Sequence, residues 1–183
     1  MNPRPGRKRR IARWFLLVAL AIITIGLLLP QRMTIPVEDA TTRDWNPDAF
    51  WYEPWGRSGV HKGIDIFAVE GRPVVAATSG LVVYRGEWRD GGKVIAVLGP
   101  RWRIHYYAHL SDFAGAEPWL VSRGETLGAV GRTGNAANKP PHLHYSVVSL
   151  VPLPWRATRE TQGWKRMFYL DPDELLVPHR SFN

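Results

Sequence analysis

The chain lacks cysteine entirely, and this absence removes several kinds of chemistry at once. It excludes a cysteine nucleophile, a disulfide framework and a metal site built from thiolates. It does not decide the compartment, because an exported protein can fold without disulfides. Histidine is also scarce, with six in 183 residues, so two histidines placed one residue apart in "NKPPHLHY" call for an explanation.

Net positive charge is small beyond the N-terminus, although the whole chain has a net charge of +8. Six basic residues precede residue 14, and the remaining chain holds 18 basic and 16 acidic residues. The positive charge is therefore a terminal cluster rather than a patch on a folded domain. This distribution disfavours nucleic acid as a partner.

An apolar stretch without charge follows this cluster, from Trp14 to Leu29. As a helix its 16 residues would rise about 24 Å, and flanking Arg13 suits a membrane interface. A cleaved signal peptide is the rival interpretation, but it requires a small-residue cleavage site that "LLLPQRM" lacks. We predict an uncleaved single-pass anchor in the cytoplasmic (inner) membrane. The positive-inside rule then places the N-terminus in the cytoplasm and the later chain outside, in the periplasm of a Gram-negative cell.

Shifts in composition divide the chain into five predicted segments. They are a cytoplasmic basic segment (1–13), the transmembrane anchor (14–29), a linker with a Trp-rich docking end (30–56), a β domain (57–150) and a C-terminal extension packed on that domain (151–183). The Trp-rich end, residues 45–55, is too apolar for a free tether. It is either a strap that buries aromatic side chains against the domain or a lid over a site.

The β domain is predicted from short β-branched or alternating runs separated by glycine-rich turns, such as "GLVVYRG" and "KVIAVLG". Such a pattern is typical of a compact antiparallel sheet, sandwich or barrel. The extension adds one predicted helix in "LDPDELL", with Asp171 as N-cap, Pro172 at the first helical position and Glu174 at the capping-box position. The fold class is thus mostly β, preceded by a transmembrane helix.

Polar residues able to bind a metal recur in three separate segments. In "HKGID", a bend at Gly63 can bring His61 and Asp65 together, and imidazole with carboxylate suits Zn²⁺. Taken alone, this pair is weak evidence for a metal site, because an ordinary surface pair is the commoner explanation. In "RIHYYAHL", we expect His105 to be an ordinary exposed strand residue, whereas His109 ends the run where a strand enters a loop, a position that often carries function.

The third segment holds His142 and His144, which a strand would place on one face about 7 Å apart. Together the three segments offer a three-ligand zinc site with two spare imidazoles. A catalytic zinc site uses three protein ligands and an open position for water. The spare imidazoles could move protons or stabilise an oxyanion.

In order and spacing these motifs resemble the M23 peptidases, the lysostaphin-like or LytM-type metallopeptidases of bacterial cell walls. The resemblance covers roughly half of the chain, from about Val60 to Val148. It is carried by "HKGIDIFAVEGRPVVAATSGLVV", "YYAHLS", "RGETLGAVGRTGN" and "PHLHYSV". It implies a mostly antiparallel β domain with one zinc ion in an open groove. It also implies a zinc-dependent endopeptidase that hydrolyses the peptide stems or crosslinks of peptidoglycan.

The resemblance also implies residue roles. His61, Asp65 and His144 fall at the family's zinc ligands, and His109 and His142 at its two catalytic histidines, with the general base left open between the two.

Two departures from the family stand out. Ser146 replaces the glutamate of many members, a change that we expect to affect strand packing more than chemistry. The loop "GNAANKPPHLH" and the excursion "VPLPWRATRETQGWKRMF" are longer than the common form and could reshape the groove wall.

Two other classes of function stay open at this level. M23-like binding modules that activate other wall hydrolases are one alternative, but such members usually lack part of the zinc set, which is complete here. A phosphocarrier with paired histidines is another, and the predicted external location disfavours it.

Overall fold

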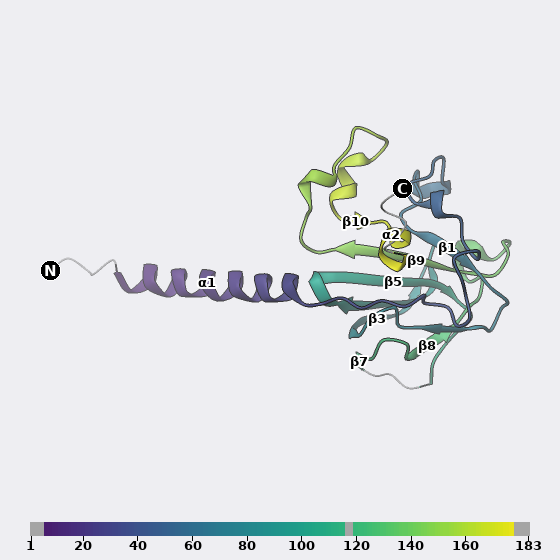
Figure 1. The fold of residues 1–183 in the computed structure, drawn as a ribbon, viewed down its shortest axis with the longest axis horizontal. Coiled ribbons are helices and arrows are strands. Elements are labelled where there is room, and N and C mark those ends of the chain that lie inside the picture. Colours follow the sequence, from purple (N-terminus) through teal and green to yellow (C-terminus); the bar gives the residue numbers. More distant parts are fainter. Residues whose placement is uncertain (1–5, 116–118, 178–183) are drawn as a thin grey trace.

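The computed structural model describes residues 6–115 and 119–177 of the chain. The predicted antiparallel, mostly β fold is confirmed, and a long helix, α1 (Gly6–Leu28), precedes it (Figure 1). This helix begins inside the basic cluster, ahead of the apolar stretch, because arginine and lysine are themselves good helix formers. His179 lies outside the described residues.

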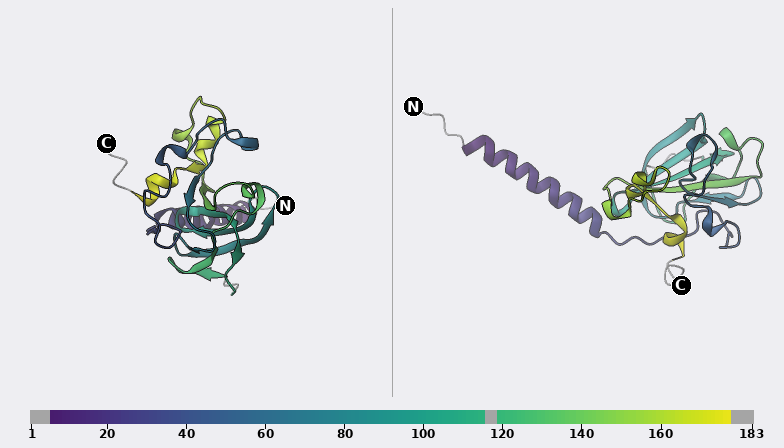
Figure 2. Two further views of the ribbon diagram at one scale, coloured as in Figure 1. Left: turned by 90° about the vertical axis from the view of Figure 1, so that its right-hand side faces the viewer. Right: turned by 90° about the horizontal axis from the view of Figure 1, so that it is seen from above.

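Helix α1 projects away from the β domain (Figure 1 and the right-hand view of Figure 2). Its segment Arg9–Leu28 has a mean hydropathy of 2.4 and is almost wholly exposed. By length and composition this segment could cross a bilayer. A signal sequence near an N-terminus shares both properties.

Two antiparallel sheets form the domain. The larger sheet has the strand order β1 (Ile64–Phe67), β9 (His142–Ser149), β5 (Arg103–Leu110), β4 (Gly92–Gly99), β3 (Gly80–Trp88) and β7 (Leu120–Val121), with β10 (Tyr169–Leu170) also paired to β9. The smaller sheet has the order β2 (Pro73–Val75), β8 (Thr126–Ala129) and β6 (Asp112–Phe113). Consecutive strands β3, β4 and β5 form a meander, and β9 inserts between β5 and β1.

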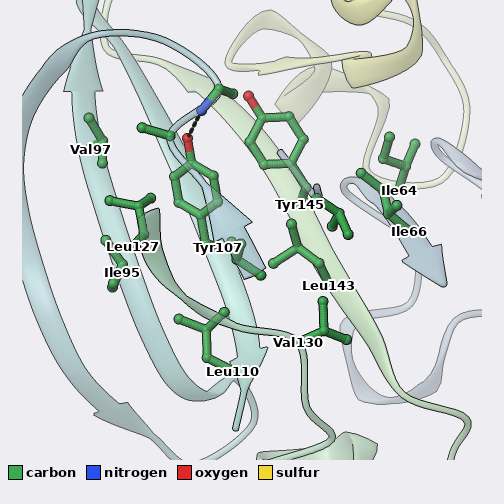
Figure 3. Close-up of a cluster of buried hydrophobic side chains, with 14 of the residues drawn as sticks. Ile64, Ile66, Ile95, Val97, Tyr107, Leu110, Leu127, Val130, Leu143 and Tyr145 are labelled. Carbon is green, nitrogen blue, oxygen red and sulfur yellow. Dashed lines mark hydrogen bonds between the residues drawn. The ribbon is translucent and has the colours of Figure 1, made fainter. Parts of the chain in front are cut away.

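The core fills the space beside the central strands (Figure 3). Alternation along β9 sends Leu143, Tyr145 and Val147 into it, and all three are fully buried. Tyr107 on β5 is equally buried, and its hydroxyl accepts a hydrogen bond from the backbone N–H of Ala77 at 2.9 Å. Because side chains alternate along a strand, the same pattern turns the even-numbered residues of β9 to the opposite face.

The segment after α1 packs against the domain along most of its length. The N–H of Thr34 donates to the carbonyl of Ala77 at 2.9 Å, and Val37, almost fully buried, pairs with Val74 of β2. Further on, Trp45 is buried, and its indole N–H donates to the Asp173 carboxylate at 2.7 Å. These contacts are those of a strap rather than a free tether.

The predicted C-terminal helix is present as α2 (Pro172–Leu176). The Asp171 carboxylate caps it by accepting from the N–H of Asp173, and Pro172 occupies the first helical position. Glu174 instead accepts a hydrogen bond from Arg156 at 3.4 Å.

Candidate metal centre

Strand pairing brings the first two candidate metal ligands together. In the antiparallel register of β1 and β9, Asp65 lies directly opposite His144. His61 precedes β1, and the chain bends at Gly63 so that the imidazole returns towards the strands. A side chain at Gly63 would collide with the carbonyl oxygen of Tyr145 and the hydroxyl of Ser146, so this bend requires glycine.

Three potential ligand atoms converge at this point. His61 Nε2 lies 3.2 Å from Asp65 Oδ1 and 3.1 Å from His144 Nδ1, and that Nδ1 lies 2.8 Å from the same carboxylate oxygen. The alternative of an ordinary surface pair for His61 and Asp65 is excluded, because His61 is 1% and Asp65 9% exposed. Two imidazoles and a carboxylate are a donor set that suits zinc, so these three residues could hold such an ion.

The outer nitrogens of both imidazoles have partners that fix ring orientation. His61 Nδ1 donates to the carbonyl of Ala49 at 3.0 Å, which leaves Nε2 directed at the centre. His144 Nε2 lies 2.9 Å from the Ser146 hydroxyl, which leaves Nδ1 directed there. Trp55 stacks on the His61 ring with centroids 4.0 Å apart. Such outer contacts preorganise ligands before a metal binds.

Two further histidines flank this group. His142 Nδ1 donates to the carbonyl of Pro140 at 2.7 Å, and its Nε2 lies 3.8 Å from Asp65 Oδ2. His109 Nδ1 donates to the carbonyl of Thr133 at 2.9 Å, and its ring lies 5.1 Å from that of His142. Both rings therefore use Nδ1 as a donor, which leaves Nε2 as the nitrogen able to accept a proton.

The backbone at His109 is unusual, since its φ of +66° lies in the left-handed region. A non-glycine residue rarely adopts this conformation, and such strain concentrates at functional sites. Here it occurs at the penultimate residue of β5, and the His109 imidazole lies beside that of His142 on β9. The expectation that His109 lies at a strand-to-loop transition agrees with this position.

Burial and hydrogen bonding shift the pKa values of Asp65, His144 and His109. Burial alone would raise the pKa of the Asp65 carboxyl, but hydrogen bonds with His144 and His61 together outweigh burial and hold that pKa well below its usual range. Burial lowers the pKa of His144, although Asp65 opposes the effect. Burial, reinforced by His144 and His142, lowers the pKa of His109 to about 4. At neutral pH the carboxylate is ionised, and His109 and His144 are neutral.

The group lies at the base of an open pocket of about 380 Å³. The pocket is also lined by three basic side chains, Arg57, Lys62 and Lys139, by the ring of Tyr106, and by Asp90, whose carboxylate lies 3.9 Å from the Arg57 guanidinium. Lys139 lies over the ring of Trp55, 5.6 Å from its centroid. Outside the candidate ligands the lining thus holds three cations and one carboxylate beside aromatic rings, and this excess of positive charge suits a substrate that carries carboxylates.

All five residues singled out from the sequence meet in this pocket: His61, Asp65, His109, His142 and His144. His105 does not, and the expectation that it is exposed is wrong. It is fully buried on the core side of β5, where its Nδ1 lies 2.6 Å from the Tyr145 hydroxyl. A hydroxyl partner on the neighbouring strand β9, 40 residues later in the chain, cannot be anticipated from local alternation.

Sequence reasoning missed other contributors to the pocket. Ser146 was expected to affect strand packing more than chemistry, yet its hydroxyl contacts the His144 imidazole. Ser146 follows His144 by two residues on the same strand, so both side chains share one face, and this spacing could have predicted the contact. Trp55, by contrast, reaches His61 through the fold of the strap, for which no local pattern exists.

Comparison with known proteins agrees with this geometry. The family model described as Peptidase family M23 matches residues 59–152. An L-Ala–D-Glu endopeptidase of Bacillus subtilis is 35% identical over 113 residues, which cover 57% of this chain and 35% of the relative. A murein hydrolase activator, NlpD of Salmonella dublin, is 31% identical over 105 residues, covering 56% and 27%.

A solved structure gives a similar result. The catalytic domain of lysostaphin from Staphylococcus simulans superposes with a TM-score of 0.52 at 28% identity, covering 67% of this chain and 84% of that one. The two sequence relatives are much longer than the matched region, and this chain spans about a third of their length or less.

Proposed function

Because the chain belongs to peptidase family M23, we propose that it is a zinc-dependent endopeptidase that hydrolyses peptide bonds in peptidoglycan. The observation that carries this proposal is the convergence of five side chains in one pocket. Three of them, His61, Asp65 and His144, present ligand atoms within 4.8 Å of one another. The other two, His109 and His142, flank that group with Nε2 available.

In this proposal the three clustered residues hold zinc. When bound, zinc would acidify a water molecule towards a pKa of about 7 and polarise the carbonyl of the scissile bond. Hydrolysis of an amide also requires that a proton leave the attacking water and reach the departing nitrogen. His142 and His109 can each accept and return that proton at Nε2, or donate to the oxyanion, because their Nδ1 atoms are held by backbone carbonyls.

The wall substrate is supported by the relatives and by the pocket rim. The printed names of the relatives describe an endopeptidase and a murein hydrolase activator. Peptide stems of peptidoglycan carry free carboxylates, which the basic side chains of Arg57, Lys62 and Lys139 would attract. We further propose that α1 is an uncleaved signal anchor, with its N-terminus in the cytoplasm and the β domain on the outer side, in the periplasm of a Gram-negative cell.

The proposal is tested with the full chain purified in detergent. Wild-type protein is expected to bind one zinc per chain and to release new amino groups from peptidoglycan. His144→Ala should lose both zinc and hydrolysis, whereas His142→Ala should lose hydrolysis and keep zinc. Glu87→Gln, an exposed change outside the pocket, is the matched control. Zinc loss in His142→Ala with retention in His144→Ala would reverse the two roles.

A second candidate function is a wall-binding module that activates another hydrolase. The similarity to a murein hydrolase activator favours it, and the complete ligand set argues against it. A folded, metal-free chain that binds wall material without cleaving it would support the module and exclude the enzyme.

A further inference from the structure

The C-terminal part of α1 makes specific contacts with the tip of the β4–β5 hairpin. The indole N–H of Trp102 donates to the carbonyl of Ile23 at 3.0 Å, one turn before the helix ends. Gly26 makes room for the indole, since a side chain there would collide with the Trp102 ring. Arg101 and Trp102 hold this pose with φ of +61° and +56°. Two successive left-handed residues other than glycine are strained, so the surrounding contacts must fix them.

The chain between helix and domain is too firmly held to act as a tether. Gln31 Nε2 lies 3.0 Å from Nε2 of His105, and its side-chain oxygen accepts a hydrogen bond from Arg103. Three residues later Thr34 is already bonded to the domain backbone. The orientation of the domain relative to α1 is therefore fixed at this end of the molecule.

This end also carries exposed aromatic and basic side chains. Leu150 is 53% exposed, and its N–H donates to the carbonyl of Trp102 at 2.8 Å. Trp155 is 78% exposed on the loop that follows. Figure 1 and the right-hand view of Figure 2 show this yellow-green loop, residues 150–156, reaching the same level along the helix axis as the end of α1. Arg32 and Arg101 are exposed beside the junction.

We propose that this end of the domain is a membrane-docking face that rests on the headgroups of the bilayer crossed by α1. The face consists of Arg32, Arg101, Trp102, Leu150 and Trp155. Tryptophan prefers the membrane interface, and arginine pairs with lipid phosphates there. Because Trp102 contacts the last turns of a lipid-spanning helix, its loop lies at interface depth. The inference rests on the membrane anchor proposed above and adds to it a second, peripheral contact.

Docking would fix the height of the metal centre. Strand β5 runs from Arg103, beside the docking face, to His109 in the pocket. Six residues of strand span about 20 Å at about 3.3 Å each. The pocket would therefore be held roughly 20 Å above the membrane and reach only the wall layer at that height, whereas a tethered domain would sample a range of heights.

The absence of cysteine makes a direct test simple. Single-cysteine variants Trp155→Cys and Leu150→Cys are labelled with an environment-sensitive fluorophore in the full chain. The control is Trp88→Cys, exposed at the far end of β3. Each protein is reconstituted in vesicles of phosphatidylethanolamine and phosphatidylglycerol that contain spin-labelled lipid. Labels at 155 and 150 should be quenched severalfold more than the label at 88.

A second variant tests whether the junction sets this geometry. Gly26→Leu, which would displace Trp102, should abolish the extra quenching at position 155. Ala19→Leu, an exposed helix position, should leave it intact.

Outcomes of the test separate the docking face from the anchor. Protein that resists alkaline carbonate extraction but shows equal quenching at 155, 150 and 88 would refute the docking face and leave the anchor standing. Protein that carbonate removes would refute the anchor, and the docking face with it. Labels at 155 and 150 that are shielded from water but not quenched by spin-labelled lipid would indicate a protein partner and overturn the lipid assignment.

Discussion

The bend at Gly63 is a single sequence position on which the geometry of the candidate metal centre depends. In Gly63→Ala the new methyl group would collide with the backbone carbonyl of Tyr145 and lie 2.5 Å from the Ser146 hydroxyl. It would also stand 3.0 Å from Cε1 of His144, a ring that presents a ligand atom. Relief requires that β1 move away from β9, since the colliding atom is backbone and cannot rotate aside.

The loss of stability in Gly63→Ala can be estimated from typical values. Overpacking of a rigid site typically lowers the free energy of unfolding by about 1–3 kcal/mol. For a domain of this size, a loss of about 2 kcal/mol corresponds to a fall in melting temperature of about 4–8 °C. Separation of Asp65 from His144 should also weaken zinc binding, by about 10-fold or more, as displaced ligand geometry does elsewhere.

The assay is thermal unfolding in detergent, followed by tryptophan fluorescence, with and without a chelator. Chelator removes the contribution of metal, so the strain alone is measured in its presence. Gly115→Ala is the matched control, because a side chain there meets no atom within 4 Å. A Gly63→Ala protein as stable as the control in chelator, with unchanged zinc affinity, would refute the close-approach argument.

Three further outcomes follow from other contacts. Ser146→Ala should weaken zinc binding about 10–100-fold, because it releases the His144 ring. The control Ser149→Ala, on the same strand beyond the site, should bind zinc like the wild type. Equal zinc titration curves for the two variants would contradict the role of Ser146. Burial, reinforced by Arg103, lowers the pKa of His105 to about 3. Below pH 6.5 the unfolded chain therefore binds one proton more at this residue than the folded chain, and the free energy of unfolding falls as the pH falls. His105→Gln should reduce that slope by about 1.4 kcal/mol per pH unit between pH 6 and 4 in denaturant titrations, and parallel curves would argue against it. Deletion of residues 31–56 should unfold the domain, because Val37 and Trp45 are buried in its core; a folded, more active product would restore the lid interpretation.

Much of the fold could be predicted because local signals agreed with one another. The alternation in "HLHYSVV" predicts that Leu143 faces the core and both histidines face away from it, and the structure shows this arrangement. The N-cap at Asp171 was likewise readable from residue type and position. Such features depend on neighbours within a few residues, which the sequence displays directly.

The missed features depend on partners far along the chain. His105 is buried among partners distant in sequence: its ring contacts the side chains of Tyr145 and Gln31, which are 40 and 74 residues away along the chain. Trp55 stacks on His61 only because the strap returns across the sheet. Alternation predicts which face a residue occupies, but it does not predict what covers that face.

The central claim is that one pocket combines a zinc site with two proton-transferring histidines to cleave peptidoglycan peptides. The most direct measurement is digestion of a defined set of crosslinked peptidoglycan dimers by the zinc-loaded full chain, with mass analysis of the products. The expected products are fragments that have gained one water at a peptide bond, and no such fragments are expected with His142→Ala. Intact dimers after incubation with folded, zinc-loaded wild-type protein would contradict it.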